Sequence, residues 1–380
     1  MQAYPDVASM LAEVAPTEPV YCVYPHVYRE TTKRFLSGFP GRVLYAVKAN
    51  NEPVVMRALI DAGVRHFDCA SVPEIASVRQ LLPDAACYFM TPCRLRGAAR
   101  AAQQRHGVRH FMVDDMSGLP PLLDEIEARG SVIFARMAVH HVSAAEDLSS
   151  KFGALPEDIP GLLHAIAASG AEPALAFNVG TGVIDPDAYR HSICVARKVL
   201  AESPLRLRLV DVGGGFPLAY PGYPVPPLED YFEAIATSAA GLPMAERGEL
   251  LAEPGRALSA PGLSAVVEVL MRKGDRLFLN DGMYGAFWEL RFKGHKRYAA
   301  RSYRPGGTLA CEQRSFTLFG PTCDASDRLP APVQLPADID VGDYVEFGAI
   351  GAYSLSGRTD FNGFYSDTII TISSDSARPP

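Results

Sequence analysis

From residue 42 onward the chain repeats one pattern: a short apolar run, a polar or glycine/proline turn, and a stretch with helical spacing. Eight such runs occur, and they are RVLYAVK at 42, HFDCA at 66, CYFMT at 87, HFMVD at 110, VIFARMAV at 132, ALAFNVG at 174, LRLVDV at 207 and ELLAE at 249. The stretches between them are long enough for right-handed crossovers between parallel strands. Eight evenly patterned units predict an α/β fold closed into a (β/α)8 barrel, and a doubly wound open sheet is the alternative.

The sequence pattern changes after about residue 260, where long helical stretches are replaced by β-branched and aromatic runs. Examples are SAVVEVLMRKG, SFTLFGPTC and DTIITIS. This predicts a separate β domain, to which the early run PVYCVYP could add a strand. We therefore expect a barrel over residues 25–260. Residues 1–24 and 261–380 together are expected to form the β domain.

Charge and cysteine content favour a small-molecule substrate. With 36 Lys+Arg against 43 Asp+Glu, the formal charge of -7 gives no general attraction to nucleic acid or to an anionic membrane. No apolar run reaches the roughly 18 residues of a membrane helix, and the N-terminus lacks a signal-peptide pattern, so a cytoplasmic location is expected. Seven scattered cysteines without a CxxC pair indicate neither a disulfide framework nor a metal site.

In a barrel of this type, functional residues lie at or just after the C-terminal ends of the strands. Those positions are unusually polar here: Lys48, Asp68, Asp114, Arg136, Asn178, Gly213 to Gly215 and Glu253. A lysine that follows an apolar strand is costly unless its charge changes, and a desolvated amine with a lowered pKa can form a Schiff base with an aldehyde. The alternative is a lysine that extends from the strand end into water.

Two further motifs indicate an anion site at the last two strand ends. GGGF at 213 supplies consecutive N–H groups that can approach a phosphate, although three glycines can equally form a tight turn. In EPGR at 253, Arg256 can pair with a phosphate, and Glu253 can hold a proton on a heterocyclic nitrogen. An imine-forming lysine, a phosphate cradle and a carboxylate for a ring nitrogen together describe a pyridoxal 5'-phosphate (PLP) site.

Over nearly its whole length the sequence resembles the fold-type III PLP decarboxylases, most closely the ornithine decarboxylase branch. The matching runs are YAVKAN at 45, FDCAS at 67, KFGA at 151, FNVGTG at 177, DVGGGFP at 211, AEPGR at 252, NDGMYGAF at 280, FGPTCD at 319, GAY at 351 and FNGF at 361. The resemblance implies an alanine racemase-like architecture, with a PLP-binding barrel followed by a C-terminal β domain.

The resemblance also implies roles for single residues. Lys48 becomes the Schiff-base lysine, and Glu253 becomes the partner of the pyridine nitrogen. The other cofactor-binding residues would be Asp68, Arg136, Asn178, Thr181, Gly213, Gly214, Gly215, Gly255, Arg256 and Tyr353.

In the family the active site lies between the two subunits of a homodimer, so FGPTCD of one chain would reach the PLP of the other. Cys323 is then the catalytic proton donor. The substrate-binding residues would be Asp324, Tyr284, Phe361 and Lys293.

Two departures from the family pattern bear on the site. Asn178 stands where the family has a histidine that stacks on the PLP ring, and His140 and His141 are possible substitutes, although a solvated loop is the simpler interpretation.

An ungapped count from NDGMYG places Lys293 where ornithine decarboxylases have an aspartate that contacts the distal amine. A lysine would repel that amine, and Arg291 lies nearby, so we expect a substrate side chain with a carboxylate. Because Asp324 keeps an acidic element, a side chain that carries both charges also fits.

The sequence thus predicts a homodimeric PLP-dependent decarboxylase that acts on a small L-amino acid through an altered side-chain pocket. The alternatives are a plain ornithine or lysine decarboxylase, a diaminopimelate decarboxylase or racemase on the same fold, and a non-catalytic homologue that binds a protein partner. Glu253 argues against a racemase, which typically has an arginine opposite the ring nitrogen. The joint presence of Lys48, Glu253, Arg256 and Cys323 argues against loss of catalysis.

Overall fold

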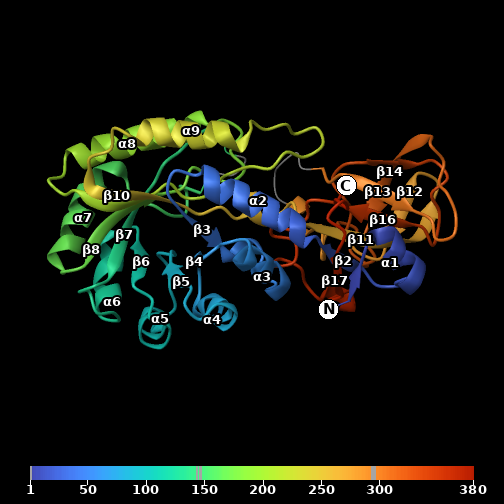
Figure 1. The fold of residues 1–380 in the computed structure, drawn as a ribbon, viewed down its shortest axis with the longest axis horizontal. Helices are drawn as coiled ribbons and strands as arrows, with labels where there is room; N and C mark the ends of the chain where they lie inside the picture. The colour runs from blue at the N-terminus through green and yellow to red at the C-terminus, as the bar shows by residue number, and fades with distance from the viewer. Residues whose placement is uncertain (1, 143, 145–147, 292–296) are drawn as a thin grey trace.

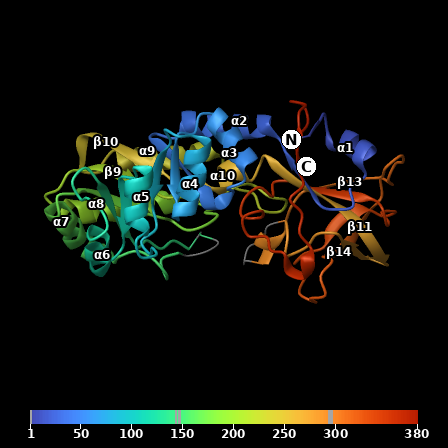
Figure 2. The same ribbon diagram turned by 90° about the horizontal axis from the view of Figure 1, so that it is seen from below.

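The structure, a computed structural model, describes residues 2–142, 144, 148–291 and 297–380. An α/β barrel lies at one end of the elongated molecule and a domain built mainly of strands lies at the other (Figure 1). Both chain termini lie at the strand-rich end, and the view from below shows the same two parts side by side (Figure 2).

The barrel consists of eight parallel strands, each of which pairs with its neighbours in chain order. The last strand returns to the first, with Leu251 opposite Arg42, and so closes the sheet. Each predicted apolar run overlaps one strand, although β5, β8 and β10 begin before their runs, and closure of the sheet confirms the barrel fold and excludes the open sheet. The strands are β3 (Arg42–Ala46), β4 (His66–Cys69), β5 (Ala86–Phe89), β6 (His110–Val113), β7 (Val132–Met137), β8 (Glu172–Phe177), β9 (Leu207–Asp211) and β10 (Met244–Ala252).

Helices cover the outside of the barrel (Figure 1). Helix α4 shows why they start where they do: the Ser71 hydroxyl accepts the N–H of Glu74 at 3.3 Å, and the Glu74 carboxylate accepts the N–H of Ala70 at 2.6 Å. The helices are α2 (Pro25–Gly38), α3 (Pro53–Asp61), α4 (Val72–Leu81), α5 (Ala98–His106), α6 (Leu119–Leu123), α7 (Ile159–Ala168), α8 (Asp187–Ala201), α9 (Leu228–Ala239) and the short α10 (Arg256–Ser259).

Large apolar side chains fill the inside of the barrel, among them Leu44, Tyr88, Phe134 and Leu251. The barrel is therefore a packed core without a channel, as its size requires. Polar side chains that could take part in catalysis therefore lie at the rims of the barrel, at the ends of the strands.

The second domain is one nine-stranded sheet. Its N-terminal strand β2 lies between β11 and β17, so the first residues of the chain are built into the sheet of the last ones. The division at residues 24 and 260 itself stays a prediction. The strands are β1 (Ala3–Tyr4), β2 (Val20–Val23), β11 (Leu263–Lys273), β12 (Arg276–Leu279), β13 (Ala300–Tyr303), β14 (Gln313–Phe319), β15 (Val333–Pro336), β16 (Tyr344–Phe347) and β17 (Ile369–Ile372).

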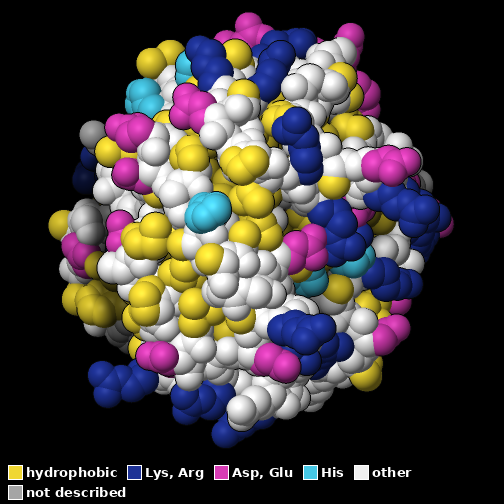
Figure 3. Space-filling model, turned by 90° about the vertical axis from the view of Figure 1, so that its left-hand side faces the viewer, with side chains coloured by type: hydrophobic (Ala, Val, Ile, Leu, Met, Phe, Trp, Pro, Cys, Tyr) yellow, Lys and Arg dark blue, Asp and Glu magenta, His cyan; other side chains and the backbone are white. Residues whose placement is uncertain are grey.

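The barrel end of the molecule presents a mixed surface, on which basic and acidic side chains are interspersed around a hydrophobic region (Figure 3). On this face the basic side chains form no continuous stripe of the kind that nucleic acids need. In the part of the chain that the structure describes, no helix has both the length and the apolar character to cross a bilayer.

Two histidines at the N-terminal rim of the barrel predict an acid-sensitive fold. Burial and the nearby Arg42 lower the pKa of both His66 and His110 to about 4. Both stay neutral in the folded chain but are protonated when unfolded below about pH 6.5, so the free energy of unfolding should fall as the pH drops from there to 4. His110→Gln should make this fall shallower by up to about 1.4 kcal/mol per pH unit in denaturant titrations. The same change at the exposed His164 is the control, and equal slopes in both variants would contradict the prediction.

Candidate active site

The C-terminal ends of the barrel strands border a pocket at the junction with the β domain. It encloses about 480 Å³ of atom-free space, counted to its open mouth. Its lining contains most of the predicted cofactor-binding residues: Lys48, Asn178, Thr181, Gly214, Gly215, Glu253, Gly255, Arg256 and Tyr353.

Lys48 lies in η1 (Val47–Ala49), a short turn that directly follows β3. Its side chain is 51% exposed, and its Nζ donates a hydrogen bond to Asp68 Oδ2 at 3.5 Å. Asp68 is only 4% exposed and is the penultimate residue of β4, whose register places it opposite Ala46 of β3. The parallel pairing of β3 and β4 therefore brings the carboxylate to the lysine.

The expected lowering of the Lys48 pKa is wrong. The Asp68 carboxylate raises the pKa of Lys48 above its ordinary value, and Tyr353 and Glu253 act in the same direction. Burial and the Arg136 guanidinium lower it, but they are outweighed. The amine of the cofactor-free chain is thus held as a cation by the surrounding carboxyl groups.

Glu253 follows β10 and is unusually poor in partners. Its Oε1 is buried and receives no hydrogen bond from another type of side chain or from the backbone of the described residues. The Asp211 carboxyl group is its close polar neighbour, and the two can share a proton. Burial raises the pKa of Glu253 well above its ordinary range, and the neighbouring Asp211 and Asp68 add to the rise. A buried carboxyl group with a raised pKa can transfer a proton to a basic nitrogen placed against it.

Asp211, at the end of β9, is a site residue that the sequence analysis missed. Its Oδ1 accepts the N–H of Gly213 at 2.7 Å, while its Oδ2 is buried and receives no hydrogen bond from an N–H or hydroxyl group of the described residues. Burial raises the pKa of Asp211 to about 7. Its position at the end of LRLVDV was the available signal, because Asp211 is a polar residue at the C-terminal end of a predicted strand.

The glycine loop after β9 fits closely between two other strand ends. Gly213 and Gly215 have φ values of +73° and +100°, which residues with side chains rarely adopt. A Cβ at Gly215 would lie 2.7 Å from the Gly180 carbonyl oxygen. The Tyr189 hydroxyl, also missed from sequence, fixes the loop by donating to the Gly214 carbonyl at 2.7 Å. Within the described residues the N–H groups of Gly214 and Gly215 have no acceptor, so they are available to an anion.

Arg256 opens α10 beside this loop. Its guanidinium lies 5.3 Å from the Tyr353 ring centroid and is paired with Glu289, a residue of η4 (Trp288–Arg291) that the sequence analysis did not single out. The available sequence signal for Glu289 was that it is the single acidic residue in the otherwise apolar run GAFWEL. Tyr353 donates its N–H to the Ala49 carbonyl at 2.7 Å, so the β domain is joined to the Lys48 turn.

Of Asn178, Arg136, His140 and His141, Asn178 lines the pocket and the other three do not. The amide Oδ1 of Asn178 accepts the N–H of Gly180 at 3.0 Å. Arg136 lies over the Phe152 ring at 5.4 Å from its centroid. It acts on Lys48 and Glu253 through its charge rather than by forming the pocket wall.

The predicted substrate residues form a second cluster, on the β domain. The Tyr284 ring stacks on Phe361 with centroids 4.4 Å apart, and its hydroxyl donates to Asp324 Oδ2. The exposed Cys323 lies at the same surface, where its N–H donates to Asn362 Oδ1 at 3.1 Å. None of these residues lines the Lys48 pocket of the same chain. Lys293 lies outside the described residues, but Arg291 places its guanidinium 3.9 Å from the Tyr284 ring centroid.

The Lys48–Asp68 pair makes a prediction for the cofactor-free protein. Asp68→Asn removes the main cause of the raised pKa, so the pKa of the Lys48 amine should fall, and an amine-reactive reagent should label it faster near neutral pH. Peptide mass spectrometry across a pH series measures this rate. Asp114→Asn is the matched control, because Asp114 binds the N–H of Gly153 at 3.0 Å. Equal labelling of both variants would contradict the assignment.

Comparison with known proteins identifies the family. The model for the pyridoxal-binding domain of the pyridoxal-dependent decarboxylases matches residues 26–260. The lysine/ornithine decarboxylase of Selenomonas ruminantium is 30% identical over 333 residues, which cover 85% of this chain and 81% of that protein. Antizyme inhibitor 2 of Xenopus laevis is 30% identical over 365 residues, 87% of this chain and 76% of that protein.

Among solved structures, the arginine decarboxylase of Paramecium bursaria Chlorella virus, bound to agmatine, is similar with a TM-score of 0.85. The two share 25% sequence identity, over 96% of this chain and 98% of that chain. The pocket fits a pyridoxal cofactor on its own geometry, because it combines an amine, an orphaned buried carboxyl oxygen and free N–H groups in a glycine loop. The chain therefore belongs to the pyridoxal-dependent decarboxylase family.

Proposed function

We propose that the chain removes the α-carboxylate of an L-amino acid, with PLP held at the Lys48 pocket. The observation that carries this proposal is the buried carboxyl group of Glu253, which lines the same pocket as Lys48 and has an oxygen that no N–H or hydroxyl group of the described residues satisfies. Its raised pKa makes Glu253 a source of a proton for the ring nitrogen of the cofactor. When bound, PLP supplies an electron sink that stabilises the negative charge left by departing carbon dioxide.

The other end of the pocket is suited to the phosphate group. The N–H groups of Gly214 and Gly215 would donate to its oxygens, and the Arg256 guanidinium would balance its charge. Lys48 would hold the cofactor covalently. Asn178 would face the cofactor without an aromatic stack, which leaves ring orientation to the other contacts.

We propose that a second copy of the chain completes this site. Cys323 and Asp324 border a surface groove of about 930 Å³ whose wall is largely apolar and includes Leu270, Phe319 and Phe364. An exposed apolar patch of this kind is typical of a protein interface. Pairing of two copies would bring the Cys323 thiol of one chain to the Lys48 pocket of the other, where it can give a proton to the carbon that lost the carboxylate.

The substrate class follows from the charges around Tyr284. Hydrogen bonds from Ser326 and Tyr284, with the Arg291 charge, lower the pKa of Asp324 to about 2, so Asp324 is anionic. Arg291 lies on the same tyrosine ring. A pocket with both signs favours an amino acid whose side chain ends in a carboxylate, or in a carboxylate and an ammonium as in diaminopimelate. The anionic Asp324 alone would favour the alternative, a plain ornithine or lysine decarboxylase.

Release of carbon dioxide tests the function. With PLP, the protein should decarboxylate diaminopimelate or an acidic amino acid faster than ornithine, lysine or arginine, and Lys48→Ala should abolish the reaction. Arg291→Gln should reduce kcat/KM for the carboxylate-tailed substrate by roughly tenfold, the effect of losing about 1.4 kcal/mol. Arg328→Gln is the control, because Arg328 lies over Phe319 instead.

Two outcomes would overturn parts of this proposal. Efficient turnover of ornithine, unchanged by Arg291→Gln, would favour the plain ornithine or lysine decarboxylase. No release from any substrate, and no cofactor attached to Lys48 after borohydride reduction and peptide mass spectrometry, would favour a non-catalytic homologue.

Subunit mixing tests the shared site. Lys48→Ala and Cys323→Ala chains should each be inactive alone. Mixed and allowed to exchange, they should recover roughly a quarter of the wild-type activity, because half of the dimers are then mixed and each of these holds one complete site. Native mass spectrometry verifies the exchange. No recovery after proven exchange would contradict a site built from two chains.

A further inference from the structure

The buried ion pair between Arg256 and Glu289 joins the barrel to the β domain at the phosphate end of the pocket. Both side chains are 5% exposed. A buried pair is stable only when its remaining hydrogen-bonding groups are also satisfied. Arg256 gains a hydrogen bond to the Tyr220 hydroxyl at 3.2 Å, and Glu289 is approached by the Tyr298 hydroxyl at 3.5 Å.

The pairing leaves one specific edge of the arginine free. Nη1 and Nη2 both donate to the Glu289 carboxylate, the former at 2.9 Å, and the second hydrogen of Nη1 serves Tyr220. The remaining edge is formed by Nε and Nη2. The Nε is buried and has no partner among the described residues. An Nε–Nη2 edge is one that can bind a phosphate through two parallel hydrogen bonds.

Arg256 lines the pocket together with Gly214 and Gly215, whereas Glu289 does not line it. The carboxylate is therefore placed to act on a phosphate at the glycine loop through the arginine that it binds. Because it holds the guanidinium in place before the phosphate arrives, less side-chain entropy is lost on binding. A carboxylate that sets the orientation of a ligand-binding side chain is a common device of metal and phosphate sites.

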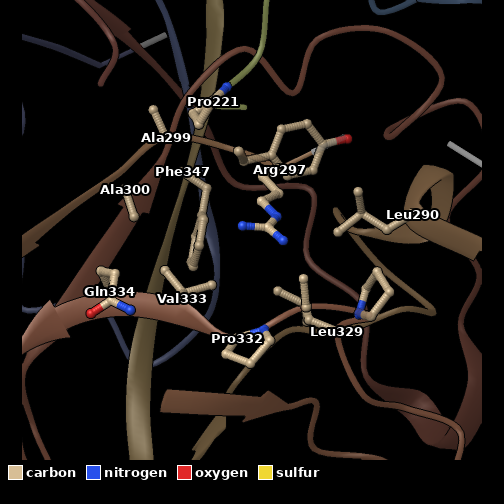
Figure 4. A pocket seen from close by; sticks show the side chains of 13 residues that line it. Pro221, Leu290, Arg297, Ala299, Ala300, Leu329, Pro332, Val333, Gln334 and Phe347 are labelled. Atoms are coloured by element: carbon tan, nitrogen blue, oxygen red, sulfur yellow. The ribbon is translucent and has the colours of Figure 1, made fainter. Parts of the chain in front are cut away.

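A second cavity, lined in part by residues of this network, supplies the control variant. It has about 810 Å³ of atom-free space, and its wall includes Leu290, Tyr298 and Pro221, which adjoin the ion-pair network in sequence or belong to it. Figure 4 shows Leu290 at its rim and the Arg297 guanidinium projecting among the lining side chains. Leu290 belongs to the same turn as Glu289 but carries no charge, so its truncation reports on packing alone.

We propose that Glu289 is a positioning residue for the cofactor phosphate: it holds Arg256 with its Nε–Nη2 edge free for the phosphate oxygens. This inference rests on the proposed function, since it requires that PLP binds at the Lys48 pocket. It assigns η4 a second role, next to that of Arg291 in the substrate cluster.

Comparing PLP with pyridoxal, which lacks the phosphate, separates this role from a structural one. The dissociation constants of both compounds are measured on the cofactor-free full chain by equilibrium dialysis, for wild type, Glu289→Gln and Leu290→Ala. Glu289→Gln should weaken PLP binding about tenfold and leave pyridoxal binding within about twofold. Leu290→Ala should change neither. If Glu289→Gln does not fold, Glu289→Asp, which keeps the charge but shortens the reach, should weaken PLP selectively by a smaller factor.

Three results would overturn the inference. Equal weakening of PLP and pyridoxal would assign Glu289 a structural role. Unchanged PLP affinity in the Gln variant would show that Arg256 needs no orientation, while PLP binding by the wild type would leave the proposed function standing. Failure of the wild type to prefer PLP over pyridoxal at all would remove both the inference and the phosphate site on which it rests.

Discussion

Three carboxyl groups lie near the Lys48 ammonium group at the C-terminal end of the barrel, and the chemistry of the site depends on this excess of acidic groups. Asp68, Asp211 and Glu253 lie at the C-terminal ends of β4, β9 and β10, and parallel closure brings these ends together around Lys48. Burial raises the pKa values of Asp211 and Glu253, and the nearby charge of Arg136 lowers them by less. Asp68, with Tyr353 and Glu253, raises the pKa of Lys48 and so favours its charged form. In the proposed function, the raised pKa of Glu253 allows it to protonate the basic ring nitrogen of the cofactor.

The opposite end of the pocket depends on contacts between the two domains. Tyr353 is tied to the Lys48 turn through the Ala49 carbonyl, and Arg256 of α10 is tied to Glu289 of η4. These links cross from the barrel to the β domain, so docking of the β domain would determine the geometry of the proposed anion site. The barrel alone would present the glycine loop with an arginine whose direction is not fixed. This gives a physical reason for a β domain in a chain whose chemistry lies at the barrel rim.

Much of this arrangement was predictable from sequence, because it depends on local pattern. The eight apolar runs predicted the strands. The C-terminal ends of three of these runs predicted Lys48, Asp68 and Glu253 as site residues. Residues that act through distant partners were not predictable in the same way. Glu289 is 33 positions from Arg256, and nothing in either segment indicates that they meet. The direction of the Lys48 pKa shift was also missed, because the sequence does not show that the Asp68 carboxylate lies within hydrogen-bonding distance of the amine.

The central claim is that Glu253 keeps the ring nitrogen of bound PLP protonated. The ¹⁵N chemical shift of PLP labelled at that nitrogen measures its protonation directly, in wild type and in Glu253→Gln. A protonated nitrogen across the neutral pH range in wild type, and an unprotonated one in the variant, is the predicted result. An unprotonated nitrogen in wild type, or the same protonated state in both proteins, would contradict it.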